Sequence, residues 1–144
     1  MRQSIEDLLA LLGRFPLAVL EFGLRLGVGA TFFKSGLVKI ASWQQTVALF
    51  EEEYRVPVLP AELAATLGTA AELICPVLLV AGIGARFGAA ALLGMTFVIQ
   101  TFVYPGNWAE HLTWASVFAY VLTQGPGALS VDHFIRRSYF GGRS

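Results

Sequence analysis

Four ionisable side chains lie within one strongly apolar stretch, residues 21–41, and they are the first candidates for chemistry. They are Glu21, Arg25, Lys34 and Lys39. An ionised side chain at the centre of a bilayer costs about 2.5–3.5 kcal/mol on insertion scales, and such charges usually face other helices, where they pair or mark a functional site. The stretch therefore predicts a polar cluster buried among helices.

Helical spacing predicts which of these charges meet. At about 100° per residue, Glu21, Arg25 and Lys39 share one helix face, while Lys34 projects from the opposite face. In an antiparallel neighbouring helix, Glu72 falls at nearly the same depth as Arg25. The sequence thus predicts an Arg25–Glu72 contact with Glu21 sharing its burial, and we expect Lys39 to extend toward the membrane surface instead.

Further polar residues recur at helical intervals on the other apolar stretches. Thr69 lies one turn before Glu72, Gln100 lies in the third stretch, and His111 lies near the start of the fourth. We expect each stretch to turn a polar side inward, so that the helices enclose a polar interior. For Arg25 and Glu72, a structural ion pair and a functional site remain equal alternatives.

The composition indicates a lipid environment. The chain has 144 residues, of which 56% are hydrophobic and 14% charged, and its mean hydropathy is +0.64. Soluble domains carry about 25% charged residues, so this chain lacks the charge to cover a water-exposed surface. The net charge of zero argues against nucleic acid as a partner. The single cysteine, Cys75, excludes an internal disulfide, and no metal site is expected.

These features predict an all-α membrane protein, a bundle of four transmembrane helices in a lipid bilayer. The expected spans are residues 16–41, 61–83, 87–105 and 109–124, because each is long and apolar enough to cross the hydrocarbon or nearly so. A short amphipathic helix is expected over residues 43–54. Basic residues flank the spans on one side: Arg2, Arg14, Arg86, Arg136, Arg137 and Arg143. This asymmetry predicts that both termini are cytoplasmic.

Four pieces of sequence, in this order and spacing, resemble the DoxX family of small four-helix bacterial inner-membrane proteins. They are "LRLGVGATFFKSGLVKI", "AAELICPVLLVAGIGARFGAAALLGM", "VYPGNWAEHLTWA" and "GPGALSVDHFI". The resemblance extends from about residue 24 to residue 139. It implies a multi-pass location in the bacterial inner membrane.

The resemblance also implies a class of function. The family is named for its similarity to the small membrane subunit of thiosulfate:quinone oxidoreductase, so we expect at most a membrane subunit of a redox system. No intrinsic cofactor is predicted, and a quinone is the candidate electron carrier. Two alternatives stay open: an assembly factor or chaperone for exported or peptide-maturation proteins, and a small permease that acts as an oligomer. Either a homo-oligomer or a complex with a redox partner is expected.

Overall fold

The computed structural model describes residues 2–140, and Arg143 lies outside this range. Within it the chain is helical, without β-strands, as predicted. The main helices are α1 (Arg2–Leu12), α2 (Leu17–Ala41), α3 (Trp43–Leu49), α4 (Ala61–Ala81), α5 (Ala85–Val98), α6 (Trp108–Gln124) and α7 (Val131–Phe140). Three short helices complete the set: η1 (Phe50–Tyr54), η2 (Ile99–Val103) and η3 (Pro105–Asn107). Helices therefore occupy all four stretches in which spans are predicted.

Proline and glycine set the limits of these helices. α2 and α4 each follow a proline in extended conformation, Pro16 and Pro60. Proline lacks an N–H, so it is well placed where the first helical amides have no partner. α4 ends at Gly82, whose φ of +72° is left-handed, and the amides of Gly82 and Ile83 both donate to the carbonyl of Leu78. This is the usual glycine termination of a helix.

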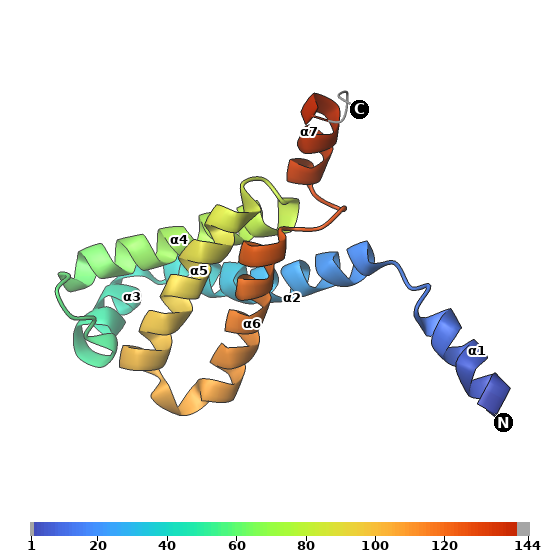
Figure 1. The fold of residues 1–144 in the computed structure, drawn as a ribbon. Coiled ribbons are helices and arrows are strands. Elements are labelled where there is room, and N and C mark those ends of the chain that lie inside the picture. The colour runs from blue at the N-terminus through green and yellow to red at the C-terminus, as the bar shows by residue number, and fades with distance from the viewer. Residues whose placement is uncertain (1, 141–144) are drawn as a thin grey trace.

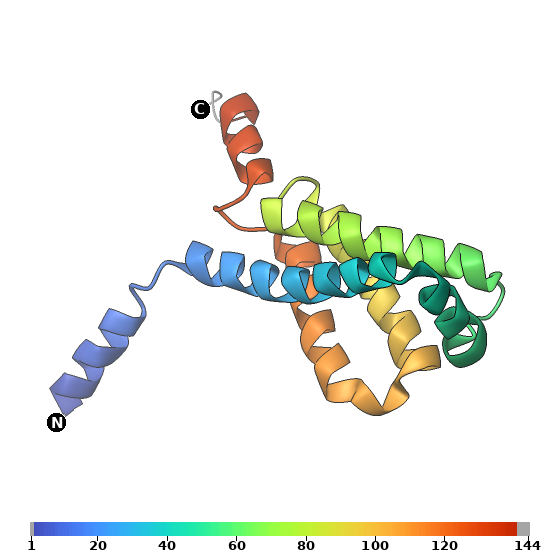
Figure 2. The same cartoon turned by 180° about the vertical axis from the view of Figure 1, so that it is seen from behind.

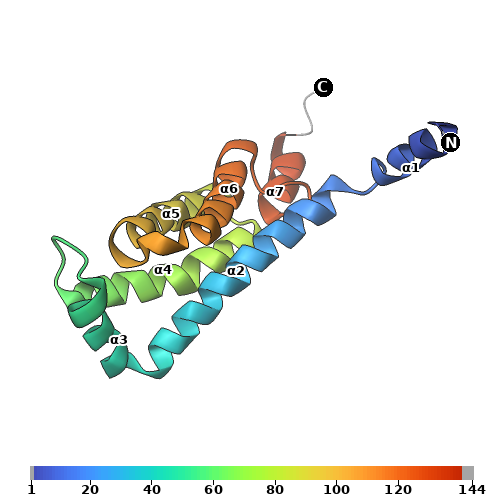
Figure 3. The ribbon, with the colours of Figure 1, turned by 90° about the horizontal axis from the view of Figure 1, so that it is seen from below.

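The helices form two layers. α2 packs antiparallel against α4, and α5 packs against α6 (Figures 1 and 3). The layers are joined mainly through α4 and α5, which follow each other in the chain. We call the end at which α2 leads into α3 the α3 end, and the opposite end the α7 end. α1 projects away from the bundle (Figure 2).

Two glycines of α2 permit its close contact with α4. A Cβ atom added at Gly29 would lie 2.6 Å from Cγ2 of Val80, and one added at Gly36 would lie 2.8 Å from Cγ of Leu73. Small residues allow helix backbones to approach in this way. The spacing of Gly23 and Gly27 also suggests close packing, but a Cβ at either position meets nothing within 4 Å. The contact face is therefore the one that carries Gly29 and Gly36.

The centre of the bundle is mainly apolar, so the polar interior is smaller than predicted, although Arg25, Thr69, Glu72 and His111 are buried. Phe118, Leu79 and Leu92 are fully buried. Phe32 of α2 meets the rings of Trp114 and Phe118 edge-on, with centroids 5.0 and 5.5 Å apart. Such contacts stabilise beyond the area they bury. Aromatic and aliphatic side chains thus fill the space between the two layers.

Several hydroxyl residues that recur at helical intervals form hydrogen bonds within their own helices. Thr66, Thr113 and Ser116 are exposed, and each hydroxyl donates to the carbonyl four residues earlier, at 2.8 to 3.0 Å. A serine or threonine in this arrangement leaves no polar group without a partner. It can therefore face lipid, and its helical spacing does not indicate which side is buried.

Two of the described helices are long and apolar enough to cross a membrane by length and composition: Ala61–Ala81 and Ala85–Val103. α2 has 25 residues, but each window of 18 residues within it contains three charged side chains. α6 is short, with 17 residues. Large apolar side chains are exposed on all four helices, among them Val38, Val77, Phe97 and Leu112.

α7 is a helix that the sequence analysis does not anticipate. The helix begins after Ser130, whose hydroxyl accepts a hydrogen bond from the amide of His133 at 3.2 Å, as an N-cap residue does. Asp132 ties α7 to the turn between α4 and α5. Its amide donates to the carbonyl of Gly82 at 2.8 Å, and its carboxylate accepts from the amides of Gly84 and Ala85.

The α2–α4 contact predicts a contrast between two glycines of the same helix. Gly36→Leu should destabilise the protein by about 1–3 kcal/mol, because overpacking a close contact forces neighbouring groups to shift. Gly27→Leu should have little effect, since the space beside Gly27 is open. Thermal unfolding of both variants in the same detergent measures the difference. Equal melting temperatures would contradict the close contact at Gly36.

Candidate functional site

A buried ion pair joins α2 to α4 near the α3 end. Nζ of Lys39 lies 2.8 Å from Oε1 and 2.7 Å from Oε2 of Glu72, and it also donates to Oγ of Ser35 at 2.8 Å. The side chains of Lys39 and Glu72 are only 12% and 7% exposed. Among residues 3–139, whose side chains the structure describes, this is the only salt bridge. The expectation that Lys39 extends to the membrane surface is therefore wrong.

The predicted Arg25–Glu72 contact is also wrong. Arg25 is fully buried, but its guanidinium donates to the carbonyls of Leu79 and Val80 at 2.9 and 2.8 Å and to that of Leu129. Leu79 and Val80 lie in the last turn of α4, where carbonyls lack helical partners and the helix dipole is negative. Arg25 thus caps the C-terminus of α4.

The relative positions of α2 and α4 explain the error. The predicted Arg25–Glu72 contact assumed that the first and second spans begin and end at the same depth in the membrane. In the structure, Gly82 packs beside the Arg25 guanidinium, so residues 17–24 extend past the end of α4 by about two helical turns. Arg25 therefore reaches the α4 terminus, and Lys39 rather than Arg25 falls beside Glu72.

Glu21 lies with Arg25 at the α7 end but has a different partner. Its Oε1 accepts from the hydroxyl of Tyr120 at 2.8 Å, and its carboxylate packs closely on Gly127. The three residues predicted to form one cluster, Glu21, Arg25 and Glu72, are thus divided between the two ends of the bundle. The shared helix face of Glu21, Arg25 and Lys39 is correct.

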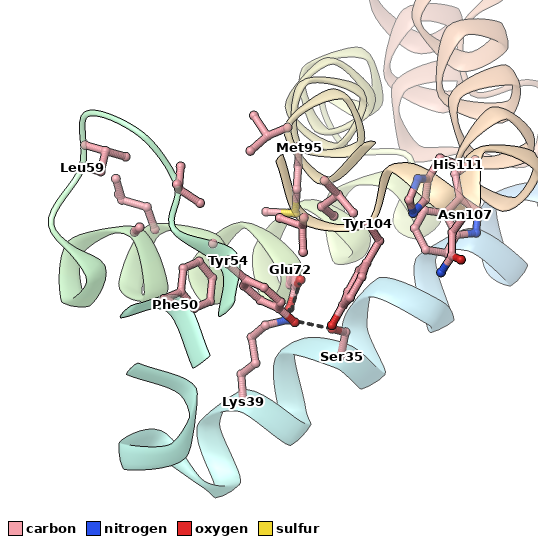
Figure 4. A pocket seen from close by; sticks show the side chains of 18 of the residues that line it. Ser35, Lys39, Phe50, Tyr54, Leu59, Glu72, Met95, Tyr104, Asn107 and His111 are labelled. Carbon is pink, nitrogen blue, oxygen red and sulfur yellow. Dashed lines mark hydrogen bonds and ion pairs between the residues drawn. The ribbon is translucent and has the colours of Figure 1, made fainter. Parts of the chain in front are cut away.

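A cavity of about 460 Å³ opens beside the ion pair at the α3 end (Figure 4). Lys39, Glu72 and Ser35 form one part of its wall, and His111 and Asn107 form another. The remaining lining is largely apolar and aromatic, and it includes Phe50, Tyr54, Leu59, Met95, Tyr104 and Trp114. The cavity therefore combines a mainly hydrophobic wall with a few polar groups, as ligand sites do.

Two tyrosines from separate connections meet at this cavity: Tyr54 ends η1, and Tyr104 follows η2. The rings of Tyr54 and Tyr104 lie edge-to-face with centroids 5.8 Å apart, and the hydroxyl of Tyr104 donates to Glu53 at 3.1 Å. Burial, the neighbouring Tyr104 and nearby carboxylates raise the pKa of Tyr54 above its usual value. Tyr54 therefore keeps its proton at physiological pH and can donate a hydrogen bond.

His111 and Gln100 form a second polar contact at the cavity. Nδ1 of His111 lies 2.6 Å from Oε1 of Gln100, and the Gln100 amide group donates to the carbonyl of Pro105 at 2.8 Å. His111 is 4% exposed. Its ring lies 5.2 Å from that of Trp114.

The other predicted candidates lie apart from the cavity. Lys34 is exposed, as expected from its opposite helix face. Thr69 is buried, and its hydroxyl has no hydrogen-bond partner in the described part of the chain. Of the predicted residues, the structure therefore gathers Lys39, Glu72 and His111 around one cavity, with Gln100 behind His111.

The residues that complete this wall were not predicted from the sequence. Ser35, Tyr54, Tyr104 and Trp114 were not among the candidates. Ser35 could have been predicted, because it lies one helical turn before Lys39 and therefore on the same face of the helix. The loop residues could not be placed, because they reach the cavity only through the fold of η1 and η2 against α4 and α5.

The ion pair predicts strong coupling between Lys39 and Glu72. Lys39→Met or Glu72→Gln alone should cost about 3–5 kcal/mol, because each leaves a buried group without its partner. The double variant should lose clearly less than the sum of the two. Chemical denaturation in detergent measures the free energies of unfolding.

A matched control uses Arg25 in place of Lys39. Arg25→Met and Glu72→Gln should add within about 0.5 kcal/mol, because the two side chains share no partner. Additive effects of Lys39→Met and Glu72→Gln would contradict the ion pair.

Comparison with known proteins assigns the chain to a family. The family profile described as DoxX matches residues 20–105, which run from α2 to the first residue of η3 and include Lys39, Glu72 and Gln100. His111 lies beyond the match. A comparison with curated proteins gives no match, and a comparison with solved structures gives none either. The match covers more than half of the chain. The chain, whose helices are apolar, therefore belongs to the DoxX family of membrane proteins.

Proposed function

We propose that this protein is a membrane subunit of a redox system and that it binds a quinone ring in the cavity beside Lys39 and Glu72. The observation that carries the proposal is the cavity itself, in which an aromatic and aliphatic lining surrounds a buried ion pair. A bound quinone would supply two-electron chemistry, and the electrons would pass to or from a partner protein. The chain's own residues would bind and orient the ring.

The size and chemistry of the cavity support a ring ligand. Its volume of about 460 Å³ lies within the roughly 300–1,000 Å³ of small-molecule sites. Phe50, Tyr54, Tyr104 and Trp114 offer flat apolar surface, and Ser35 offers a hydroxyl at the ion pair. A quinone has a flat ring, two opposed oxygen atoms and an apolar tail, so it requires both kinds of surface.

The same proposal includes four spans in a bacterial inner membrane with both termini in the cytoplasm. The partners of the buried charges support α2 as a span, because Arg25 and Lys39 donate to carbonyls and a carboxylate within the bundle. The basic residues Arg86, Arg136 and Arg137 at the α7 end support a cytoplasmic location of that end. The cavity would then open toward the outer surface.

The assembly-factor alternative receives less support. It relies on a free amphipathic surface over residues 43–54. In the structure Phe50 is buried, and Trp43, Val47 and Tyr54 pack with it against Ala64 and Ala65 of α4. The apolar side of this segment is therefore turned inward.

The proposed orientation predicts a labelling pattern. In a Cys75→Ser background, single cysteines at Glu52 or Asn107 should react with a membrane-impermeant maleimide in intact spheroplasts. A cysteine at Ser138 should react only after lysis, because α7 would lie in the cytoplasm. Labelling of Ser138→Cys before lysis, with protection of the other two, would reverse the proposed topology.

Quinone binding predicts saturable quenching of Trp114. The chain has three tryptophans, so Trp43→Phe and Trp108→Phe leave Trp114, which lines the cavity, as the only reporter. A short-chain ubiquinone analogue should quench it with a defined dissociation constant in detergent. Replacing the ion pair by Lys39→Met with Glu72→Met should weaken binding of the analogue's reduced form, whose hydroxyl can donate to Glu72, at least tenfold.

The control for this titration is Lys34→Met, which removes a lysine from the same helix but lies away from the cavity. It should bind the analogue as tightly as the parent. Quenching that never saturates, or that is the same in all three proteins, would show partitioning into detergent and refute the site.

A further inference from the structure

We infer that the cavity favours the reduced, hydroquinone form of its ring ligand over the quinone form, and that Gln100 contributes to this preference by fixing the tautomer of His111. This rests on the proposed function and specifies which redox form binds more tightly. A hydroquinone presents two O–H groups that donate hydrogen bonds, whereas a quinone presents two carbonyl oxygens that only accept them. The preference therefore depends on which groups of the cavity still lack partners.

The strongest donor at the cavity is already fully used. A lysine ammonium group has three N–H bonds. Those of Lys39 account for its three contacts, with Ser35 Oγ and with both oxygens of Glu72. A quinone carbonyl beside Lys39 would therefore have to displace one of these bonds. The Glu72 carboxylate, in contrast, keeps lone pairs that can accept from a ligand hydroxyl.

The hydrogen bonds of Gln100 determine where the proton of His111 lies. The Gln100 amide nitrogen must face the carbonyl of Pro105, because two carbonyl oxygens cannot hydrogen-bond to each other. The Gln100 oxygen then faces Nδ1 of His111 at 2.6 Å and needs a donor there. Nδ1 of the neutral ring therefore carries the hydrogen, and Nε2 is left as an acceptor.

The position of Gln100 sets the direction of the acceptor atom of His111. Gln100 lines a separate groove between α5 and α6 and does not line the cavity, whereas His111 lines both. The Nδ1 edge of the ring is thus turned to the groove, and the Nε2 edge lies on the other side. In the region that the structure describes, only Arg25 Nε and Thr69 Oγ1 are fully buried side-chain atoms without a partner, so Nε2 touches open space.

The two deeply buried groups with free capacity, Glu72 and His111, are therefore both acceptors. The half-buried indole N–H of Trp114, which forms no hydrogen bond within the described residues, is a donor in the same lining, so two acceptors stand against this one fixed donor. The hydroxyls of Ser35 and Tyr54 can donate or accept and do not discriminate between the two forms. Asn107 and Glu110 lie at the exposed rim, where one offers an amide and the other a carboxylate. The excess of hydrogen-bond acceptors among the buried groups of the cavity favours a ligand that donates hydrogen bonds. A tenfold preference for the hydroquinone would raise the two-electron potential of the bound pair by about 30 mV.

Three ligands of nearly the same shape test the preference. They are a short-chain ubiquinone analogue, its hydroquinone kept reduced under anaerobic conditions, and the dimethyl ether of that hydroquinone, which cannot donate. Calorimetric titration in detergent should show the hydroquinone binding at least tenfold more tightly than either of the others. Equal affinity of hydroquinone and quinone would overturn the inference and leave the proposed function standing. Failure of all three to bind would refute both.

Gln100→Met tests the positioning role, with Gln124→Met at the other end of the bundle as the matched control. Gln100→Met should reduce hydroquinone affinity at least fivefold without weakening quinone binding, so quinone binding reports that the variant is folded. Gln124→Met should change neither. Loss of both affinities to the same extent, or of neither, would overturn the role of Gln100.

The tautomer itself can be observed without any ligand. The chain has two histidines, so ¹⁵N-histidine labelling of a His133→Gln variant leaves His111 as the only signal. Its long-range ¹⁵N–¹H correlations should show the hydrogen on Nδ1, and Gln100→Met should add the other tautomer. A hydrogen on Nε2 in the parent protein would overturn the inference directly.

Discussion

The close contact between α2 and α4 is the feature on which the rest of the structure depends. Gly29 and Gly36 let the two backbones approach, and this fixes how far one helix is shifted along the other. That shift brings Lys39 to Glu72 and brings Arg25 to the last turn of α4. A displacement of one turn, about 5.4 Å, would separate both pairs of groups and leave buried charges without partners.

The protein accommodates its two buried cations by different means. Arg25 forms no salt bridge within the described residues but donates to three backbone carbonyls, two of them at a helix terminus, and the geometry of a guanidinium suits several acceptors at once. Lys39 forms an ion pair whose every N–H bond is used. The first arrangement holds the α7 end together. The Lys39–Glu72 ion pair lies against the cavity, and for this reason the α3 end is the stronger candidate for binding a ligand.

Between these two ends the bundle is a conventional hydrophobic core. Aromatic contacts of Phe32 with Trp114 and Phe118 connect the layers, and the buried hydroxyl of Thr96 donates to the carbonyl of Leu92 in its own helix. Polar chemistry is therefore confined to the ends of the bundle. This arrangement suits a subunit that holds a ring ligand near one membrane surface better than it suits a protomer that conducts ions by itself.

The sequence by itself determined the helical class, the positions of the four long helices and the membrane character, because these follow from local hydropathy and from the proline and glycine residues that end each element. It also identified Glu72, Lys39, Gln100 and His111 as candidates, since polar residues in apolar helices are few. Only the tertiary structure decided which of them meet. The shift between α2 and α4 depends on side-chain packing at Gly29 and Gly36, and helical periodicity contains no information on it. Likewise, Thr113 and Ser116 follow the spacing of a buried face but bond to their own helix, whereas Tyr54 and Tyr104 come together only because two distant loops fold against the same end of the bundle.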